Sequence, residues 1–340
     1  MIKQCKQATD SEQVLNDELN PSSEPSAIYR KYSQSLMEKY GEKVYKIPVN
    51  LPITCPNRDG CIGMGGCIFC GEVGTGFEAQ SATLSVREQL ERNIEIISPK
   101  YGAKKYIAYF QNYTNTYMPQ ETFQRVVEES CIEGVVGISI STRPDCISDV
   151  HLEILKQIQI TKNVAIEIEL GLQSININTL KKINRGHGFS EYLSAVLRIQ
   201  KFDFSICTHL IGNLPWDTED DFYEAAKILN VLKIDSVKIH SLYILKNTVL
   251  GSWYEEQQFE MIGPDVYIQR VIHFLRLLSP KIVVQRLFGR APEEVTLFCN
   301  WGMSWRKLQN NLEAEMKLHA YRQGDLYSQN EAIVVIGGNQ

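Results

Sequence analysis

Short apolar segments alternate with amphipathic segments along most of the chain, and this alternation restricts the possible folds more than any other feature. The apolar segments are KVYKIPVNL, KYIAYFQ, VVGISIST, VAIEIELGLQS, FSICTHLI, SVKIHSLYIL and KIVVQRLF. Stretches with helical patterning separate them after Pro119, from Ser148, around Glu191, from Thr218 and after Pro264. Strands that alternate with helices in this way predict a parallel sheet with crossover helices, an α/β fold.

Four of the apolar segments have one oily face and one polar face, because strand side chains alternate with period two. The polar faces carry Ser139, Ser141 and Arg143; Glu167, Glu169 and Gln173; Ser205, Cys207 and His209; and Lys238 and His240. Buried parallel strands are normally apolar on both faces, so a polar face indicates an interior that holds water and a polar ligand. A closed barrel fills its interior with branched apolar side chains, so we expect a partial, splayed barrel. The alternative is an open sheet whose polar positions face solvent.

A glycine-rich loop, CPNRDGCIGMGGCIFCGEVGTGF, follows the first apolar segment and contains a cluster of cysteines. The chain has nine cysteines, an odd number, and its N-terminus has no apolar stretch typical of a secretion signal. We therefore expect a cytoplasmic protein, in which clustered thiols bind metal more often than they form disulfides.

Composition also limits the possible partners. No run of about eighteen apolar residues occurs, so a membrane-spanning segment is not expected. The formal charge of −5 gives no general attraction to a polyanion, and no basic stripe with interleaved aromatic residues is present. Nucleic acid is therefore not indicated, although an enzyme acting on RNA remains one alternative.

The loop offers two metal-binding interpretations. Cys55, Cys67 and Cys70 could hold a 4Fe-4S cluster, which with only three thiolates leaves one iron open to another ligand. If Cys61 joins them, four thiolates could form a closed zinc site, and the protein would be a non-catalytic zinc or iron-sulfur module that presents a surface to a partner.

Further motifs follow the loop in a fixed order, and together with it they carry a resemblance. They are YFQNYTNTY, STRPD, ELGLQS, INRGH, THLI, KIHSLYILKNT and a terminal QRLF…W…RQG. In this the chain resembles the radical S-adenosylmethionine (SAM) superfamily, and more narrowly its YhcC/YtqA-like group. That group is related to the radical domain of the elongator catalytic subunit and to oxygen-independent coproporphyrinogen oxidase. The resemblance implies a partial (β/α)6 barrel, a partial TIM barrel, with an N-terminal cluster loop and a short C-terminal extension.

The resemblance also implies cofactors and an activity. A 4Fe-4S cluster held by Cys55, Cys67 and Cys70 would bind SAM and cleave it reductively to a 5′-deoxyadenosyl radical that acts on an unidentified substrate. Flavodoxin or ferredoxin would supply the electron. The residues implied as contacts of SAM are Gln111, Asn112, Ser141, Glu169, Gln173 and Arg185. For Arg185 the alternative is a surface charge at a helix end.

Catalytic residues are not identified by the resemblance, and four candidates come from the polar faces. His209 and His240 could be acid-base groups that face the substrate, or satisfied polar residues of the core. Glu167 and Lys238 could act on the substrate or form an ion pair with each other inside the barrel.

Three parts are expected along the chain. Residues 1–25 form a flexible leader, residues 26–280 the barrel with the cluster loop at 52–78, and residues 281–340 an extension that packs on the barrel. Arg286, Trp301 and Trp305 could line the substrate mouth, with aromatic packing as the alternative role for the tryptophans. Trp216, at the end of a strand, is expected to narrow the pocket or stack on adenine.

Overall fold

The computed structural model describes residues 27–71 and 79–327. The leader expected over residues 1–25 and the end of the cluster loop, residues 72–78, lie outside the described residues. Within the described ranges, no helix combines the length and the apolar character that crossing a bilayer would require.

One parallel sheet of seven strands forms the centre of the molecule, in the order β1-β2-β3-β4-β5-β6-β8. Its strands are β1 (Val44–Val49), β2 (Lys105–Phe110), β3 (Val135–Thr142), β4 (Ala165–Gln173), β5 (Ser205–Ile211), β6 (Ser236–His240) and β8 (Val283–Arg286). Among the described residues no strand joins β1 to β8, since β1 pairs with β2 and β8 pairs with β6 and forms one isolated bridge from Val284 to Lys31. The curled sheet therefore does not close on itself. This confirms the partial barrel.

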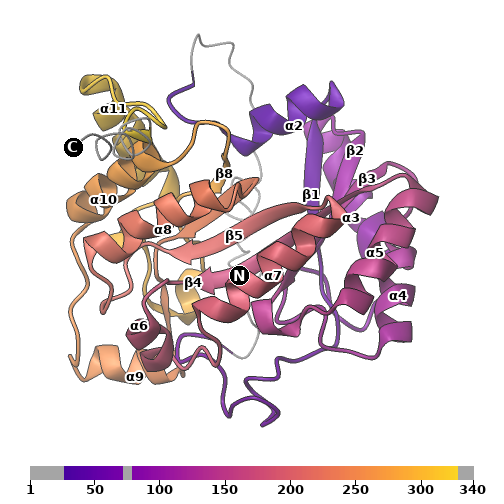
Figure 1. The fold of residues 1–340 in the computed structure, drawn as a ribbon, viewed down its shortest axis with the longest axis horizontal. Helices are drawn as coiled ribbons and strands as arrows, with labels where there is room; N and C mark the ends of the chain where they lie inside the picture. The colour runs from indigo at the N-terminus through magenta and orange to yellow at the C-terminus, as the bar shows by residue number, and fades with distance from the viewer. Residues whose placement is uncertain (1–26, 72–78, 328–340) are drawn as a thin grey trace, which may run out of the picture.

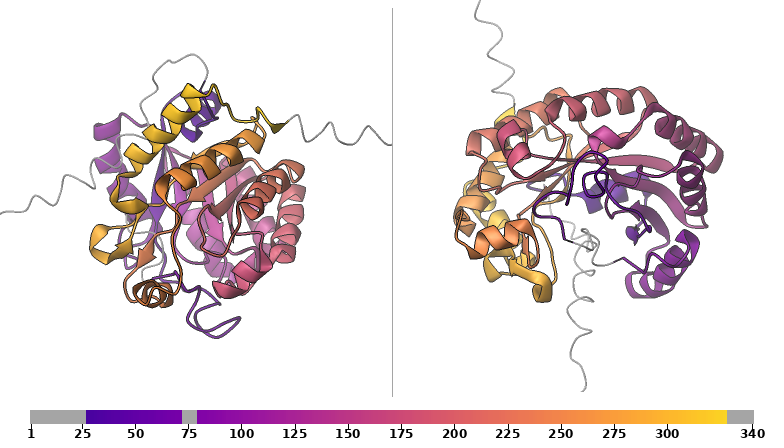
Figure 2. Two further views of the ribbon diagram at one scale, coloured as in Figure 1. Left: turned by 90° about the vertical axis from the view of Figure 1, so that its left-hand side faces the viewer. Right: turned by 90° about the horizontal axis from the view of Figure 1, so that it is seen from below.

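Helices cover the outside of the sheet in an incomplete ring, which is open between its purple N-terminal and its yellow C-terminal ends (Figure 2, right). They are α2 (Tyr32–Tyr40), α3 (Val86–Tyr101), α4 (Gln120–Glu129), α5 (Asp149–Lys162), α6 (Ile177–Lys182), α7 (Phe189–Ile199), α8 (Glu219–Val231), α9 (Val249–Glu255), α10 (Pro264–Leu277) and α11 (Trp305–Leu318) (Figure 1).

Local sequence signals set the ends of several helices. The hydroxyls of Ser148 and Thr218 cap α5 and α8 by accepting hydrogen bonds from backbone amides of the first turn. Pro264 opens α10, where its missing amide costs nothing, and Gly41 ends α2 in a left-handed conformation. The starts of α5, α8 and α10 agree with the helical stretches expected from Ser148, from Thr218 and after Pro264.

Period two gives the sheet its two faces. Ile47, Ile140 and Ile168 are fully buried in the layer between the strands and the helices, and they belong to one large apolar core. Burial of such a side chain contributes roughly 1.5–3 kcal/mol, so this outer layer supplies most of the driving force for folding. The inner face is left for polar residues.

The C-terminal part of the chain closes one side of the barrel. A small antiparallel sheet joins β7 (Ile244–Leu245) to β9 (Thr296–Phe298). The amide of Asn300 donates to the carbonyl of Gly289, and its oxygen accepts from Ser241 at the end of β6. Because β8 is a strand of the main sheet, the expected domain boundary at residue 280 separates one barrel strand from the other six.

Candidate functional site

A cavity of about 160 Å³ lies at the carboxyl ends of the strands, between them and the cysteine loop. Cys55, Cys67 and Cys70 all line it, whereas Cys61 does not. Cys61 is exposed, and its thiol interacts with the hydroxyl of Tyr117. The loop therefore turns three of its four thiols to one space and the fourth away from it.

Nitrogen donors surround the two thiols nearest the end of the loop. Arg185 Nη1 lies 3.4 Å from Cys67 Sγ, and Asn57 Nδ2 lies 3.8 Å from the same sulfur. Arg58 Nη1 lies 3.5 Å from Cys70 Sγ. Cationic and amide donors stabilise thiolate over thiol, so this environment suits metal-bound sulfur.

Without a metal, the surroundings of Cys70 disfavour its thiolate. Burial, and then the neighbouring Cys67, raise the pKa of Cys70 to about 11. Metal binding would offset the cost of ionising the buried thiol, because the bound cation replaces the proton.

The spacing of the thiols argues against a closed zinc site. With a Zn–S bond of about 2.3 Å, the sulfurs of a tetrahedral site lie about 3.8 Å apart. In the part of the chain that the structure describes, which includes all four loop cysteines, no three of them come within 4.8 Å of one another. A larger metal group fits this arrangement better than a single ion.

Most of the residues expected to contact SAM line the same cavity. These are Gln111, Ser141, Glu169, Gln173 and Arg185. Asn112 is the exception, since it is 1% exposed and donates its amide to Asn50, 2.8 Å away. Asn112 is therefore better placed to hold the end of β2 in position than to contact SAM directly.

The end of β4 is shaped for close approach to this cavity. Gln173 has a φ of 76°, which is unusual for a residue with a side chain, and the register with β5 shifts beside it. A Cβ at Gly171 would lie 2.7 Å from Arg185 Nη2, which donates to the Gly171 carbonyl. A side chain at position 171 would therefore displace the guanidinium of Arg185 from its place over the strand.

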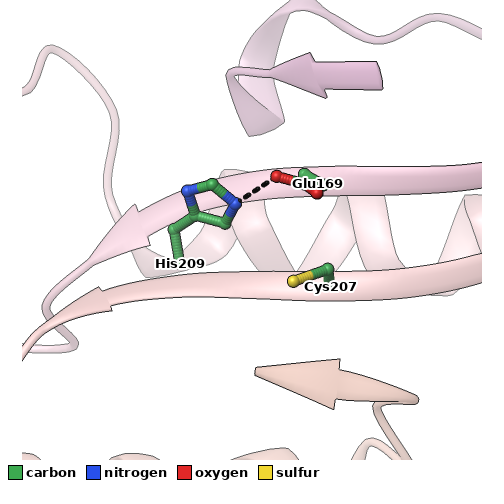
Figure 3. A group of neighbouring side chains, drawn as sticks. All are labelled: Glu169, Cys207 and His209. Atoms are coloured by element: carbon green, nitrogen blue, oxygen red, sulfur yellow. Dashed lines mark hydrogen bonds and ion pairs between the residues drawn. The ribbon is translucent and has the colours of Figure 1, made fainter. Parts of the chain in front are cut away.

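The barrel interior below the cavity is organised around Glu169, which is 1% exposed. Its Oε1 accepts from Lys46 and its Oε2 from Lys238, 2.8 Å away. Tyr109 also donates to Oε2 over 2.8 Å, and its ring centre lies 4.5 Å from the ammonium of Lys46 and 4.6 Å from that of Lys238. His209 Nε2 completes the cluster at 2.6 Å (Figure 3).

These partners fix the charge of Glu169. Burial acts to raise the pKa of its carboxyl, but Lys238, Lys46 and His209 together hold that pKa well below its usual value. Glu169, Cys207 and His209 lie close enough together to hold a metal ion (Figure 3). The two lysines already balance the carboxylate, and burial keeps the Cys207 pKa well above its usual value, so the cluster is better described as an ion-pair network.

The four candidate catalytic residues separate into two levels. His209, Lys238 and His240 line the upper cavity, with the two imidazole rings 5.4 Å apart. Glu167 instead lines a second cavity at the amino ends of the strands. The expected pair of Glu167 with Lys238 does not form, because Glu167 binds Lys46 at 2.8 Å while Lys238 binds Glu169.

Both histidines are held neutral at neutral pH. Burial and Lys238 lower the pKa of His209, and burial, His209 and Arg286 lower that of His240 well below its usual value. The carboxylate of Glu169 can only accept, so Nε2 of His209 carries the proton and Nδ1 keeps a lone pair.

Several functional neighbours were not found in the sequence. Lys46 is the one charged residue of β1, and Arg58 lies between Cys55 and Cys61; the sequence shows these charges but not their partners. Trp216 was expected at the pocket but packs against Trp253 and Phe259, and it is not among the described residues that line the cavity.

Comparison with known proteins adds independent information. Residues 57–229 match the family model of the radical SAM superfamily, and residues 234–318 match that of the Radical_SAM C-terminal domain. YtqA of Bacillus subtilis is 33% identical over 92% of this chain and 96% of its own length. YhcC of Escherichia coli is 30% identical over 79% of this chain and 86% of its own length.

The fold has a counterpart among solved structures. The structure of Elp3 from Methanocaldococcus infernus with an N-terminal deletion superposes with a TM-score of 0.63 at 17% identity. The superposition covers 85% of this chain and 68% of the Elp3 chain. At this identity the match supports the fold alone.

The Glu169 network makes a prediction about stability. The Glu169→Gln variant keeps the shape but leaves Lys238 without a buried counterion, so we expect a loss of roughly 3–5 kcal/mol in the free energy of unfolding. Because the folded pKa lies below the usual 4.5, the difference from wild type should be complete above about pH 4.5 and shrink as the pH falls through the folded pKa. Urea denaturation at several pH values measures it.

The matched control is Glu91→Gln, which breaks an exposed ion pair between Glu91 and Arg87 on α3. Surface pairs contribute little, so its denaturation midpoint should stay near wild type. Equal midpoints for the Glu169 and Glu91 variants would contradict a central role for the network.

Proposed function

The chain belongs to the radical SAM superfamily, and we propose that it binds a 4Fe-4S cluster through Cys55, Cys67 and Cys70 beside a SAM molecule in the upper cavity. The observation that carries this proposal is that these three thiols share one cavity with five of the residues expected to contact SAM. When bound and reduced, the cluster supplies one electron that cleaves SAM to methionine and a 5′-deoxyadenosyl radical.

The protein's own groups suit that cluster. Arg58, Arg185 and Asn57 direct N–H groups at the sulfurs of Cys67 and Cys70. Buried hydrogen-bonding atoms with no partner among the described residues remain beside them, Arg185 Nε and Asn57 Oδ1. Such atoms are costly unless a ligand or water satisfies them, which supports a binding site here.

Residues at the strand ends would hold SAM. Gln111 and Gln173 lie on either side of Ser141, since β2, β3 and β4 are adjacent. The contacts of Arg185 with Gly171 and Cys67 do not use all of its N–H groups. The remaining N–H groups could bind a carboxylate. Glu169 would act indirectly, because protein donors already occupy both of its oxygens.

The remaining groups would orient the substrate and handle protons. His209 presents a neutral imidazole whose Nδ1 can accept a proton, while Glu169 fixes its ring through Nε2. With SAM and substrate bound, the walls of the cavity would keep water from the radical, so that hydrogen abstraction outcompetes quenching. The electron donor would be a flavodoxin or ferredoxin.

The cysteine assignment is tested by single substitutions. After anaerobic purification and reconstitution, Cys55→Ala, Cys67→Ala and Cys70→Ala should each lose most iron and sulfide and form no 5′-deoxyadenosine with dithionite and SAM. Cys61→Ala is the matched control in the same loop and should keep both, because its thiol is exposed outside the cavity. Metal analysis and chromatography measure the two properties.

A closed zinc site predicts a different outcome from the same substitutions. One zinc per chain, no iron uptake and equal damage from Cys61→Ala would favour the closed zinc site and overturn the proposal.

The arginine beside Cys70 should tune the cluster. A cationic N–H donor stabilises the more negative, reduced state, so Arg58→Gln should shift the reduction potential to a more negative value. Iron content should remain close to wild type. A potentiometric titration followed by electron paramagnetic resonance measures this shift.

The control for this prediction is Arg87→Gln, which removes an exposed arginine from α3. If both variants leave the potential unchanged, Arg58 has no electrostatic influence on the cluster.

A further inference from the structure

We propose that Arg286, at the end of β8, binds an anionic group of the substrate, a carboxylate or a phosphate. This inference rests on the proposed function, because it concerns the substrate side of the same cavity. It defines a substrate class that the family assignment leaves open.

Arg286 is positioned in the interior by the strand register. It is the partner of Lys238 across the β6–β8 pair, and Lys238 points inward to Glu169. Arg286 lines the upper cavity and also a neighbouring cavity of about 280 Å³. The two spaces share Tyr109, Gln111, Lys238 and Arg290 as well, so Arg286 lies where they meet.

The guanidinium of Arg286 lacks the kind of counterion that Lys238 and Arg143 have. Lys238 is paired with Glu169, and Arg143 is paired with Asp145 at 2.7 Å. Within residues 27–71 and 79–327, Arg286 forms no ion pair and no hydrogen bond, and its charge is felt by the neighbouring His240 and Tyr243. A partly buried guanidinium that keeps its charge needs an acceptor, and a bound anion supplies one.

The surrounding charge favours an anion as well. Glu169 is the one carboxylate among the described residues that line the upper cavity, and the neighbouring cavity has none. Arg290 stacks on Trp305 with its guanidinium carbon 3.9 Å from the ring centre, which adds a second cation at the same mouth. A carboxylate or phosphate could bind Arg286 in the bidentate manner that the planar guanidinium allows.

Arg286 lies away from the residues that are proposed to bind the cluster and SAM. Arg58 and Arg185 contact the cysteines, and Gln173 and Arg185 approach from β4 and the segment after it. In the sheet order, β5 and β6 separate β4 from β8. Arg286 therefore faces the opposite side of the cavity, next to His240, where it would fix the orientation of a substrate.

Anion binding can be measured before the substrate is known. Inorganic phosphate and succinate are titrated separately by calorimetry into the reconstituted protein with SAM bound, at low ionic strength. The wild type should bind one of the two probes, which identifies the chemistry. Arg286→Gln should weaken this binding at least tenfold, and Arg286→Lys should restore only part of it. Arg125→Gln, on exposed α4, should match the wild type.

The same samples separate this inference from the proposed function. Formation of 5′-deoxyadenosine and the affinity for SAM should survive in Arg286→Gln. Binding of neither probe to the wild type, or equal binding to wild type and Arg286→Gln, would overturn the anion site even if SAM is cleaved. A tenfold loss of SAM affinity in Arg286→Gln with intact anion binding would assign the arginine to the cofactor and also overturn it. Absence of 5′-deoxyadenosine from the wild type would instead count against the proposed function alone.

Discussion

The buried carboxylate of Glu169 is the interaction on which the inside of this barrel depends. It accepts hydrogen bonds from Lys46 on β1 and Lys238 on β6, and so links strands on opposite sides of its own strand in the curled sheet. An unpaired charge at this depth would cost several kcal/mol, so all the partners must be present together. The curvature of the sheet and its polar interior are therefore coupled, because only a curled sheet brings β1 and β6 to the same carboxylate.

This network also divides the interior into two levels. Glu167 borders the space at the amino ends of the strands, and it binds Lys46 and Gln285, which line the neighbouring cavity. Glu169 and His209 border the space at the carboxyl ends, where the cysteine loop lies. Ionic side chains between the two spaces replace the apolar layers of an ordinary closed barrel. A polar floor of this kind can hold a histidine neutral and oriented, which an apolar floor could not.

Period two predicted which residues face inward, and it placed Glu167, Glu169, His209 and Lys238 on that face correctly. It could not predict their partners, because pairing depends on strands that are distant in sequence and on the bulges that shift the register at β4 and at β6. Lys46 was missed for that reason, and Glu167 was expected to pair with Lys238. The contacts of Asn57 and Arg58 with the cysteines could not be predicted either, because an irregular loop has no periodicity that indicates where its side chains point.

The cations of the upper cavity separate by what they contact. Arg58 and Arg185 contact the sulfurs, Lys238 contacts Glu169, and Arg143 contacts Asp145. Each of these charges is balanced by a group of the protein or by the thiolates of a bound cluster. Arg286 is balanced by neither, and two strands, β5 and β6, separate its strand from β4. Lys238 and Arg143 each have a carboxylate partner, whereas Arg286 has none beside a cavity that is poor in carboxylates. A bound anion would complete it, and this supports placing the charged end of the substrate at β8.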